Sequence, residues 1–244
     1  MKYTHHYTIK WHDTDANRQV CPSQILAYMQ ETANHHLISY GMSLDELRDT
    51  RGLGFLLSRI AIRIYEQLHA YEEIDVETWI CESRGLSFHR CFRILRGKTV
   101  VAEAFSIWAL MDLRALKLLP STAFPYEIEP ELPLPMSARV RLPALAQMEC
   151  VGERRIVYSD IDYNGHMNNT HYPNMLCDFT RDICQKKVVG MTLSFLHEAA
   201  YGHTLKVYRS ESEDGGFFRT VNEEGTTCLE ALLLTEPIDE IQKL

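Results

Sequence analysis

The stretch YSDIDYNGHMNN, residues 158–169, joins two segments of different periodicity. Residues 154–158 before it alternate in the manner of a strand, and the apolar run 172–179 after it predicts a helix from Tyr172 to about Ile183. Gly165 permits a tight turn between the two. We therefore predict a strand, a polar corner and a helix start, where free backbone N–H groups await an acceptor oxygen.

The same plan occurs near the beginning of the chain. Residues 13–17 read Asp-Thr-Asp-Ala-Asn, follow an alternating run at 3–11 and precede a helical pattern at 25–37. An offset of 147 residues carries the two Asp and the Asn onto residues 160–164, which hold the same residue types in the same order. Farther along the chain, the alternating segments of the two copies match at an offset of 131 residues. The offset is smaller there because the first copy has a longer segment between its corner and these strands. The chain is therefore predicted to be a tandem repeat.

Alternating segments typical of strands follow each corner. They cover residues 55–65, 74–80, 88–94 and 99–113 in the first half, and 188–196, 205–210, 217–221 and 227–235 in the second. Six prolines interrupt residues 120–143, which show no periodicity. We expect an N-terminal domain at 1–119, a Pro-rich linker at 120–150 and a C-terminal domain at 151–244, each domain with a helix against an antiparallel sheet.

The two copies differ at the positions where chemistry could occur. The second copy has His166 where the first has Gln19, and it has Glu198 where the first has Gln67. A neutral amide can hold a geometry but cannot accept a proton near pH 7. The second half is therefore predicted to be catalytic, and the first to bind or support.

Residues 162–169, DYNGHMNN, resemble the D-x-N-x-H-x-N-N signature in the C-terminal half of acyl-ACP thioesterases. The resemblance implies an α+β fold of two tandem hot-dog domains, each a long helix wrapped by an antiparallel sheet. It also implies hydrolysis of fatty acyl-ACP, which ends chain elongation in fatty-acid synthesis. Residues 194–200 resemble the family strand that carries an acid, matched by Glu198. Ala199 stands where the plant enzymes often have Cys, which excludes a thiol nucleophile there.

The resemblance and the residue types suggest roles in thioester hydrolysis. Asp162 is assigned as nucleophile or base, directly or through a water, and Asn164 would fix that water or the imidazole. His166 would polarise or shuttle a proton, and Glu198 would set its tautomer or act as the base. Backbone N–H groups at the start of the helix near Thr170 are candidate oxyanion donors. Which carboxylate attacks is left open.

Substrate contacts are a weaker expectation. Residues 106–112 resemble a family strand, and on it Trp108 and Met111, together with Met29 of the first helix, are predicted to line the acyl cavity. Plain core packing is the alternative for all three. A set of basic residues would form either a docking patch for an acidic carrier protein or an ordinary solvated face. These are Arg90, Arg93, Arg96, Lys98, Arg114 and Lys117.

Composition narrows the possible partners. The net charge of −8 opposes nucleic acid, and an acidic carrier would need a local basic patch. No run is long enough for a membrane span and no signal peptide begins the sequence, so we expect a cytoplasmic protein. Seven Cys without a CxxC pair indicate reduced thiols. The adjacent His pairs lack further ligands, so no metal and no cofactor are expected.

Two other functions remain open from the sequence. One is an acyl-CoA thioesterase on the same fold. The other is a hot-dog protein that binds acyl thioesters without turning them over. The expected partners are an acyl carrier protein with its fatty acyl chain, or a small-molecule acyl thioester, and the chain could be a monomer or a homodimer.

Overall fold

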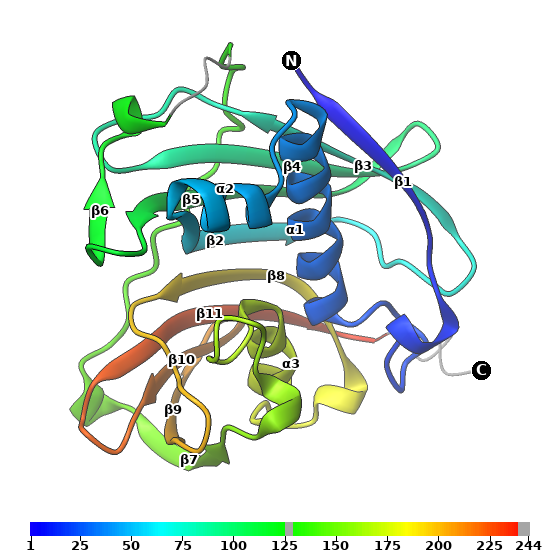
Figure 1. The fold of residues 1–244 in the computed structure, drawn as a ribbon. Helices are drawn as coiled ribbons and strands as arrows, with labels where there is room; N and C mark the ends of the chain where they lie inside the picture. Colours follow the sequence, from blue (N-terminus) through cyan, green and yellow to red (C-terminus); the bar gives the residue numbers. More distant parts are fainter. Residues whose placement is uncertain (125–128, 239–244) are drawn as a thin grey trace.

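Ten strands form one antiparallel sheet in the order β1-β3-β4-β5-β2-β8-β11-β10-β9-β7, and β6 pairs with β5 (Figure 1). This is a computed structural model, which describes residues 1–124 and 129–238. The first half contributes β1 (Tyr3–Thr8), β2 (Leu53–Ile64), β3 (Glu73–Ile80), β4 (Phe88–Arg96), β5 (Thr99–Asp112) and β6 (Lys117–Leu119). The second contributes β7 (Glu149–Arg155), β8 (Lys186–Phe195), β9 (Thr204–Ser212), β10 (Gly215–Val221) and β11 (Thr227–Pro237).

The three α-helices of the described residues lie on one side of this sheet (Figure 1). They are α1 (Pro22–Ser39), α2 (Leu44–Arg51) and α3 (Tyr172–Asp178). Along α1, Ile25, Met29 and Ala33 recur at helical spacing and are buried. Ser43 caps α2 by accepting a hydrogen bond from the backbone N–H of Glu46. The predicted α+β class is therefore confirmed.

The strand order is symmetric about its centre. From each end inward, β1 corresponds to β7, β3 to β9, β4 to β10, β5 to β11 and β2 to β8. At the seam, β2 and β8 pair antiparallel, with Ala61 opposite Thr192. Those two residues are 131 apart, which is the offset predicted from the sequence. The duplication therefore appears in space as an approximate two-fold axis through the seam.

The second helix is shorter than predicted. The apolar pattern suggested a helix from Tyr172 to about Ile183, but α3 ends at Asp178. The Thr180 hydroxyl bonds back to a carbonyl of the last turn, and Asp182 has a left-handed backbone with φ 54°. Such a residue cannot continue an α-helix. Ile183 instead begins a separate 3₁₀ turn, Ile183–Gln185.

The strands before the two corners also end earlier than predicted. β1 stops at Thr8 and β7 at Arg155, and a 3₁₀ turn follows each, Trp11–Asp13 and Tyr158–Asp160. In both turns the carboxylate of the last Asp accepts a backbone N–H from three residues before it. That local bond competes with the sheet ladder and ends the strand.

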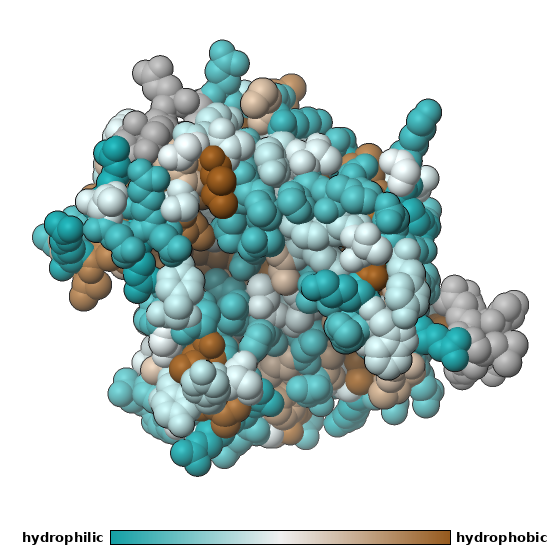
Figure 2. All heavy atoms as spheres, turned by 45° about the vertical axis from the view of Figure 1, so that its right-hand side comes forward, coloured by the Kyte–Doolittle hydropathy of each residue, from teal (hydrophilic) through white to brown (hydrophobic). Residues whose placement is uncertain are grey.

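The Pro-rich segment crosses the outer side of the first-half sheet. Trp79 donates its indole N–H to the Leu132 carbonyl at 2.9 Å, and Glu131 donates its backbone N–H to the Ile80 carbonyl at 2.9 Å. The side of the molecule in Figure 2 is mainly hydrophilic, with apolar residues in small, separate patches. In the part of the chain that the structure describes, no helix has the length and apolar character needed to cross a membrane.

Candidate active site

The second polar corner is a tight turn held by its own backbone. The Asp162 N–H donates to the His166 carbonyl at 3.2 Å, and the Gly165 N–H donates to the Asp162 carbonyl at 3.0 Å. The Asp162 carboxylate accepts the Asn164 N–H at 2.8 Å. Gly165 has φ 84°, a conformation that favours glycine. The turn therefore fixes the direction of each side chain that it carries.

His166 and Glu198, 32 residues apart in the chain, meet at this corner. A bridge pairs His166 with Ala200, and the Met167 N–H donates to the Ala199 carbonyl at 2.8 Å. The pairing places His166 Nε2 3.5 Å from Glu198 Oε1. The imidazole is 19% exposed and the carboxylate 66% exposed. The largely buried imidazole of His166 and the exposed carboxylate of Glu198 thus form one pair.

Asn164 is positioned by the other half of the molecule. Arg48 of α2 donates from Nη1 to Asn164 Oδ1 at 2.6 Å, and its guanidinium lies over the Tyr163 ring at 5.0 Å. The Asn164 side-chain oxygen is thereby occupied, so its NH₂ group is the part left to face a water or a substrate oxygen. Sequence reasoning missed Arg48, because a contact across 116 residues has no local signal.

Asp162 is close in sequence to the pair but is bonded separately. Its carboxylate bonds to the backbone of the turn, and among the described residues no hydrogen bond or ion pair joins it to the His166 ring. Asp160 is buried and bonds to Arg154 at 2.5 Å and to the Val157 N–H at 2.9 Å. Asp160 therefore holds the corner together.

The helix start offers fewer free donors than expected. Asn168 caps the turn before α3, where its Oδ1 accepts the Thr170 N–H at 2.9 Å. The His171 N–H donates to the Asn168 carbonyl at 2.9 Å. These two amides are occupied, so an oxyanion would need donors elsewhere, such as the Asn164 NH₂ group.

The first corner repeats the same backbone bonds. Gln19 pairs with His69 as His166 pairs with Ala200, and Asp15 accepts the Asn17 N–H at 2.8 Å. The offsets of 147 and 131 carry both of these interactions onto their counterparts in the second corner. The repeat alignment predicted from the sequence is confirmed.

The side chains of the first corner face a different neighbour. Gln67 donates from Nε2 to the Val188 carbonyl at 2.9 Å, and Asn17 donates from Nδ2 to the Lys186 carbonyl at 3.3 Å. A pocket of about 200 Å³ lies beside Gln19 and Gln67. The amides there tie the first corner to the second half.

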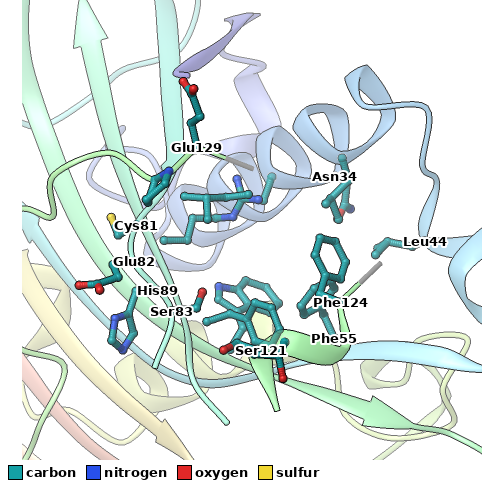
Figure 3. Close-up of a pocket in the computed structure, with 18 residues that line it drawn as sticks. Asn34, Leu44, Phe55, Cys81, Glu82, Ser83, His89, Ser121, Phe124 and Glu129 are labelled. Atoms are coloured by element: carbon teal, nitrogen blue, oxygen red, sulfur yellow. The ribbon is translucent and has the colours of Figure 1, made fainter. Parts of the chain in front are cut away.

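A larger cavity, of about 850 Å³, lies between α1 and the sheet of the first half (Figure 3). Leu44, Phe55, Phe124 and Trp108 give it apolar walls. Figure 3 shows Leu44, Phe55 and Phe124 gathered at one end and Cys81, Glu82 and His89 at the other. Its size is that of a typical small-ligand site.

The cavity lies close to the second corner by way of α2. Leu44 lines the cavity, and Arg48, one turn later on the same face of the helix, holds Asn164. Helix α2 therefore lies between the apolar end of the cavity and the polar corner.

Of the three predicted substrate contacts, Trp108 lines the cavity. Met29 and Met111 are not among the described residues that line it. Met29 is fully buried in the core. Met111 is an odd number of residues from Trp108 on β5, so its side chain points to the opposite face of the sheet.

The basic residues of β4 do not form an open patch. Arg93 pairs with Glu103 at 2.7 Å, and Arg96 pairs with Glu66 and Glu72. Arg90 is buried and lines the cavity. Strand alternation places Arg90 on the inner face of the sheet with Phe88 and Phe92. The sequence prediction grouped Arg90 with the surface residues because other basic residues lie close to it in the chain.

Cys177 and Cys184 give no alternative nucleophile at the corner. All seven cysteines are free thiols, as expected. Cys177 lies on α3, where burial raises its pKa to about 12. Cys184 lies in the 3₁₀ turn after α3. Ala199 is buried beside Glu198, and its methyl group can take no part in the chemistry.

The sequence matches the family model for the acyl-ACP thioesterase N-terminal domain over residues 1–121, and the C-terminal domain model over residues 147–234. It is 23% identical, over 84% of its length, to a chloroplastic acyl-[acyl-carrier-protein] hydrolase of Cuphea viscosissima. It is 22% identical, over 88% of its length, to a chloroplastic palmitoyl-acyl carrier protein thioesterase of Cuphea hookeriana. The chain spans 54% and 56% of these two proteins.

Solved structures share the whole fold. An acyl-ACP thioesterase from Bacteroides thetaiotaomicron superimposes with a TM-score of 0.85 at 21% identity, covering 96% of this chain and 98% of the other. A 12:0-ACP thioesterase from Umbellularia californica does so with 0.80 at 16% identity, covering 97% and 98%. At these identities the likeness establishes the tandem hot-dog fold.

Proposed function

The chain belongs to the acyl-ACP thioesterase family, and from this premise we propose that it hydrolyses fatty acyl-ACP to free fatty acid. The observation that carries the proposal is the His166–Glu198 pair, 3.5 Å apart at a corner next to an apolar cavity. The first corner has the same backbone bonds but carries Gln19 and Gln67 at the two positions that match His166 and Glu198. The turn therefore forms without His166 and Glu198, and we assign these two ionisable groups to catalysis.

We assign the steps as follows. Glu198 accepts a hydrogen bond from the Nε2–H group of His166. The Nδ1 atom of the imidazole is then unprotonated and can take a proton. Asp162 activates the attack on the thioester carbon, as nucleophile or through a water, and Asn164 donates to the developing oxyanion. When a water attacks, its proton passes to His166 Nδ1, the C–S bond breaks, and the departing thiolate takes that proton from the imidazolium. When Asp162 attacks, the C–S bond breaks to give an acyl anhydride, and the water that hydrolyses the anhydride gives up a proton through His166, which balances the proton taken by the thiolate. Water supplies the oxygen of the released acid.

The first half would hold the acyl chain. Its cavity is large, has apolar residues at the end beside Leu44 of α2, and is connected to the second corner through Arg48 of the same helix. Burial of each methylene contributes about 0.8 kcal/mol, so the cavity supplies affinity while the second half supplies the proton-transfer groups. We place the activity at the end of fatty-acid elongation, in the cytoplasm, where the seven free thiols would remain reduced.

Thiol release from acyl-ACP and acyl-CoA of equal chain length tests the proposal. We expect a higher kcat/KM for acyl-ACP, and loss of turnover in His166→Gln with the fold unchanged. A higher value for acyl-CoA would reassign the carrier. Saturating substrate with no thiol released by the wild-type protein would indicate a binding protein instead.

A further inference from the structure

A buried arginine lies in the wall of the cavity, which has apolar residues such as Phe55 and Trp108 and polar ones such as Glu82 and His89. Arg90 of β4 is 7% exposed and lines the cavity. Its Nη1 donates to His36 Nδ1 at 3.1 Å and to Thr78 Oγ1 at 3.0 Å. Both partners are fully buried, so the guanidinium is held in one orientation by groups behind it.

Neither partner carries negative charge. Burial and the Arg90 charge lower the pKa of His36 to about 4, so its ring is neutral near pH 7. Burial lowers the pKa of Arg90 to about 10, which leaves the guanidinium protonated. Among residues 1–124 and 129–238 no carboxylate pairs with Arg90, unlike Arg93 on the same strand, which pairs with Glu103.

The guanidinium also has donors to spare. It carries five N–H groups, and the two bonds to His36 and Thr78 come from Nη1 alone. In the described part of the chain no group accepts from its Nε or Nη2. Among the described residues, Nε and Nη2 of Arg90 are not buried atoms that lack a partner, so they reach the open space of the cavity, where an acceptor on a bound molecule can pair with them.

The position of Arg90 places that acceptor far from the reacting end. The order of strands from the seam is β2, β5, β4, β3, with Phe55 on the first, Trp108 on the second and Arg90 on the third. Two strand spacings, roughly 10 Å, separate β2 from β4. An acyl chain that enters beside α2 would pass Phe55 and Trp108 before it meets Arg90.

We propose that Arg90 is a specificity-determining residue, which binds an oxygen acceptor near the far end of the acyl chain. The acceptor is a hydroxyl, keto or carboxylate oxygen. A plain alkyl chain would leave the spare donors unpaired, and it would be bound less well than an oxygenated chain of the same length. The inference names the substrate class of the proposed thioesterase and rests on that function.

Calorimetric binding of free acids tests the inference without turnover. The probes are fatty acids of equal length that end in a methyl, a hydroxyl or a second carboxylate. The wild-type protein should bind the oxygenated acids roughly 10- to 100-fold more tightly, the usual value of a hydrogen bond to a charged donor. A carboxylate preferred over a hydroxyl would show ion pairing; the reverse would show that the nearby Glu82 and Glu129 disfavour an anion.

Variants locate the effect at Arg90. Arg90→Met should remove the preference, Arg90→Lys should keep part of it, and Arg93→Met, on the opposite face of β4, should leave it unchanged. Methyl-ended acids that bind as tightly as oxygenated acids in the wild type would overturn the inference, whether or not Arg90→Met folds. So would a preference that survives in a folded Arg90→Met. A protein that prefers oxygenated acids but releases no thiol would contradict the proposed hydrolysis and support this inference.

Discussion

The two polar corners are alike in backbone and different in chemistry. Asp15 and Asp162 each accept the N–H of the residue two positions later, at 2.8 Å in both copies. The same bond in a corner with Gln19 and in a corner with His166 shows that the Asp serves the turn in either case. The Asp and Asn types are therefore compatible with structure alone, whereas the ionisable pair requires another explanation.

The corners also differ in what approaches them across the seam. Asn17 donates to a backbone carbonyl of Lys186, while Asn164 accepts from the side chain of Arg48. The first corner is thus tied to the second half, and the second corner faces α2 and, past it, the large cavity. The first corner also borders the pocket of about 200 Å³, so the two copies of the turn have different neighbours on the molecule.

The most direct way to break this comparison is to make the second corner resemble the first. His166→Gln installs the residue of the first copy, and we expect kcat to fall by roughly 10²- to 10⁴-fold because the proton-transfer group is lost. Thiol release under saturating acyl-ACP measures the loss. Gln19→Ala is the matched control and should keep the wild-type rate; an equal loss there would make both corners functional.

Exchange of each Asp for Asn separates turn from chemistry. Asn also presents a side-chain oxygen to the turn, so Asp15→Asn and Asp162→Asn should both fold. Only Asp162→Asn should lower kcat, by roughly 10²- to 10³-fold, because an amide cannot act as base or nucleophile. Equal rates in the two variants, measured by the same assay, would remove Asp162 from the mechanism.

Glu198→Gln removes the acid that orients the imidazole. We expect kcat to fall by roughly 10- to 100-fold, the usual effect of losing a carboxylate partner of a histidine. Steady-state kinetics with acyl-ACP provide the measurement, and Gln67→Ala serves as the control in the first copy. A rate unchanged by Glu198→Gln would mean that the 3.5 Å pair is incidental.

Arg48→Met tests the contribution of α2 to the second corner. Loss of the 2.6 Å bond to Asn164 should lower kcat about 5- to 10-fold, the value of one hydrogen bond to a charged donor at an exposed site. The melting temperature should remain near that of the wild type. If Arg48→Met alters KM alone, Arg48 contacts the substrate rather than positioning Asn164.

The smallest expected effect concerns stability. Gly165 has φ 84° and open space around its α-carbon, so Gly165→Ala meets only backbone strain. We expect a loss of about 1 kcal/mol in the free energy of unfolding, measured by urea denaturation. The first corner has Arg18 at this position with φ 61°, so the turn tolerates a side chain. A loss far above this value would point to a contact that only the second corner makes.

Most of this comparison could be predicted from the sequence, because the first copy of the repeat serves as a reference for the second. Strand alternation predicted strands at the positions of β4 and β5, and the matched corners identified His166 and Glu198 as the positions that differ. Arg48 had no such signal, because its contact depends on how α2 packs against a turn in the other half. The end of α3 was missed because the apolar residue Ile183 continues the helical pattern beyond the left-handed Asp182.

Arg90 shows a different reason for error. Its neighbours Arg93 and Arg96 suggested a charged surface, yet one residue of β4 in two must point inward. The same rule excludes Met111 from the face that carries Trp108. In both cases the alternation of side chains along the strand could be read from the sequence. The prediction for Arg90 followed the local charge instead, and the prediction for Met111 followed the family resemblance.

The seam between β2 and β8 has a consequence for how the chain denatures. Five residue pairs, Arg59–Arg63 with Gly190–Ser194, join the halves by backbone hydrogen bonds. Melting one half would leave the edge strand of the other unpaired, so both are expected to unfold in a single cooperative transition. Either half expressed alone would present that bare edge to solvent and would be prone to cover it with a second copy of itself.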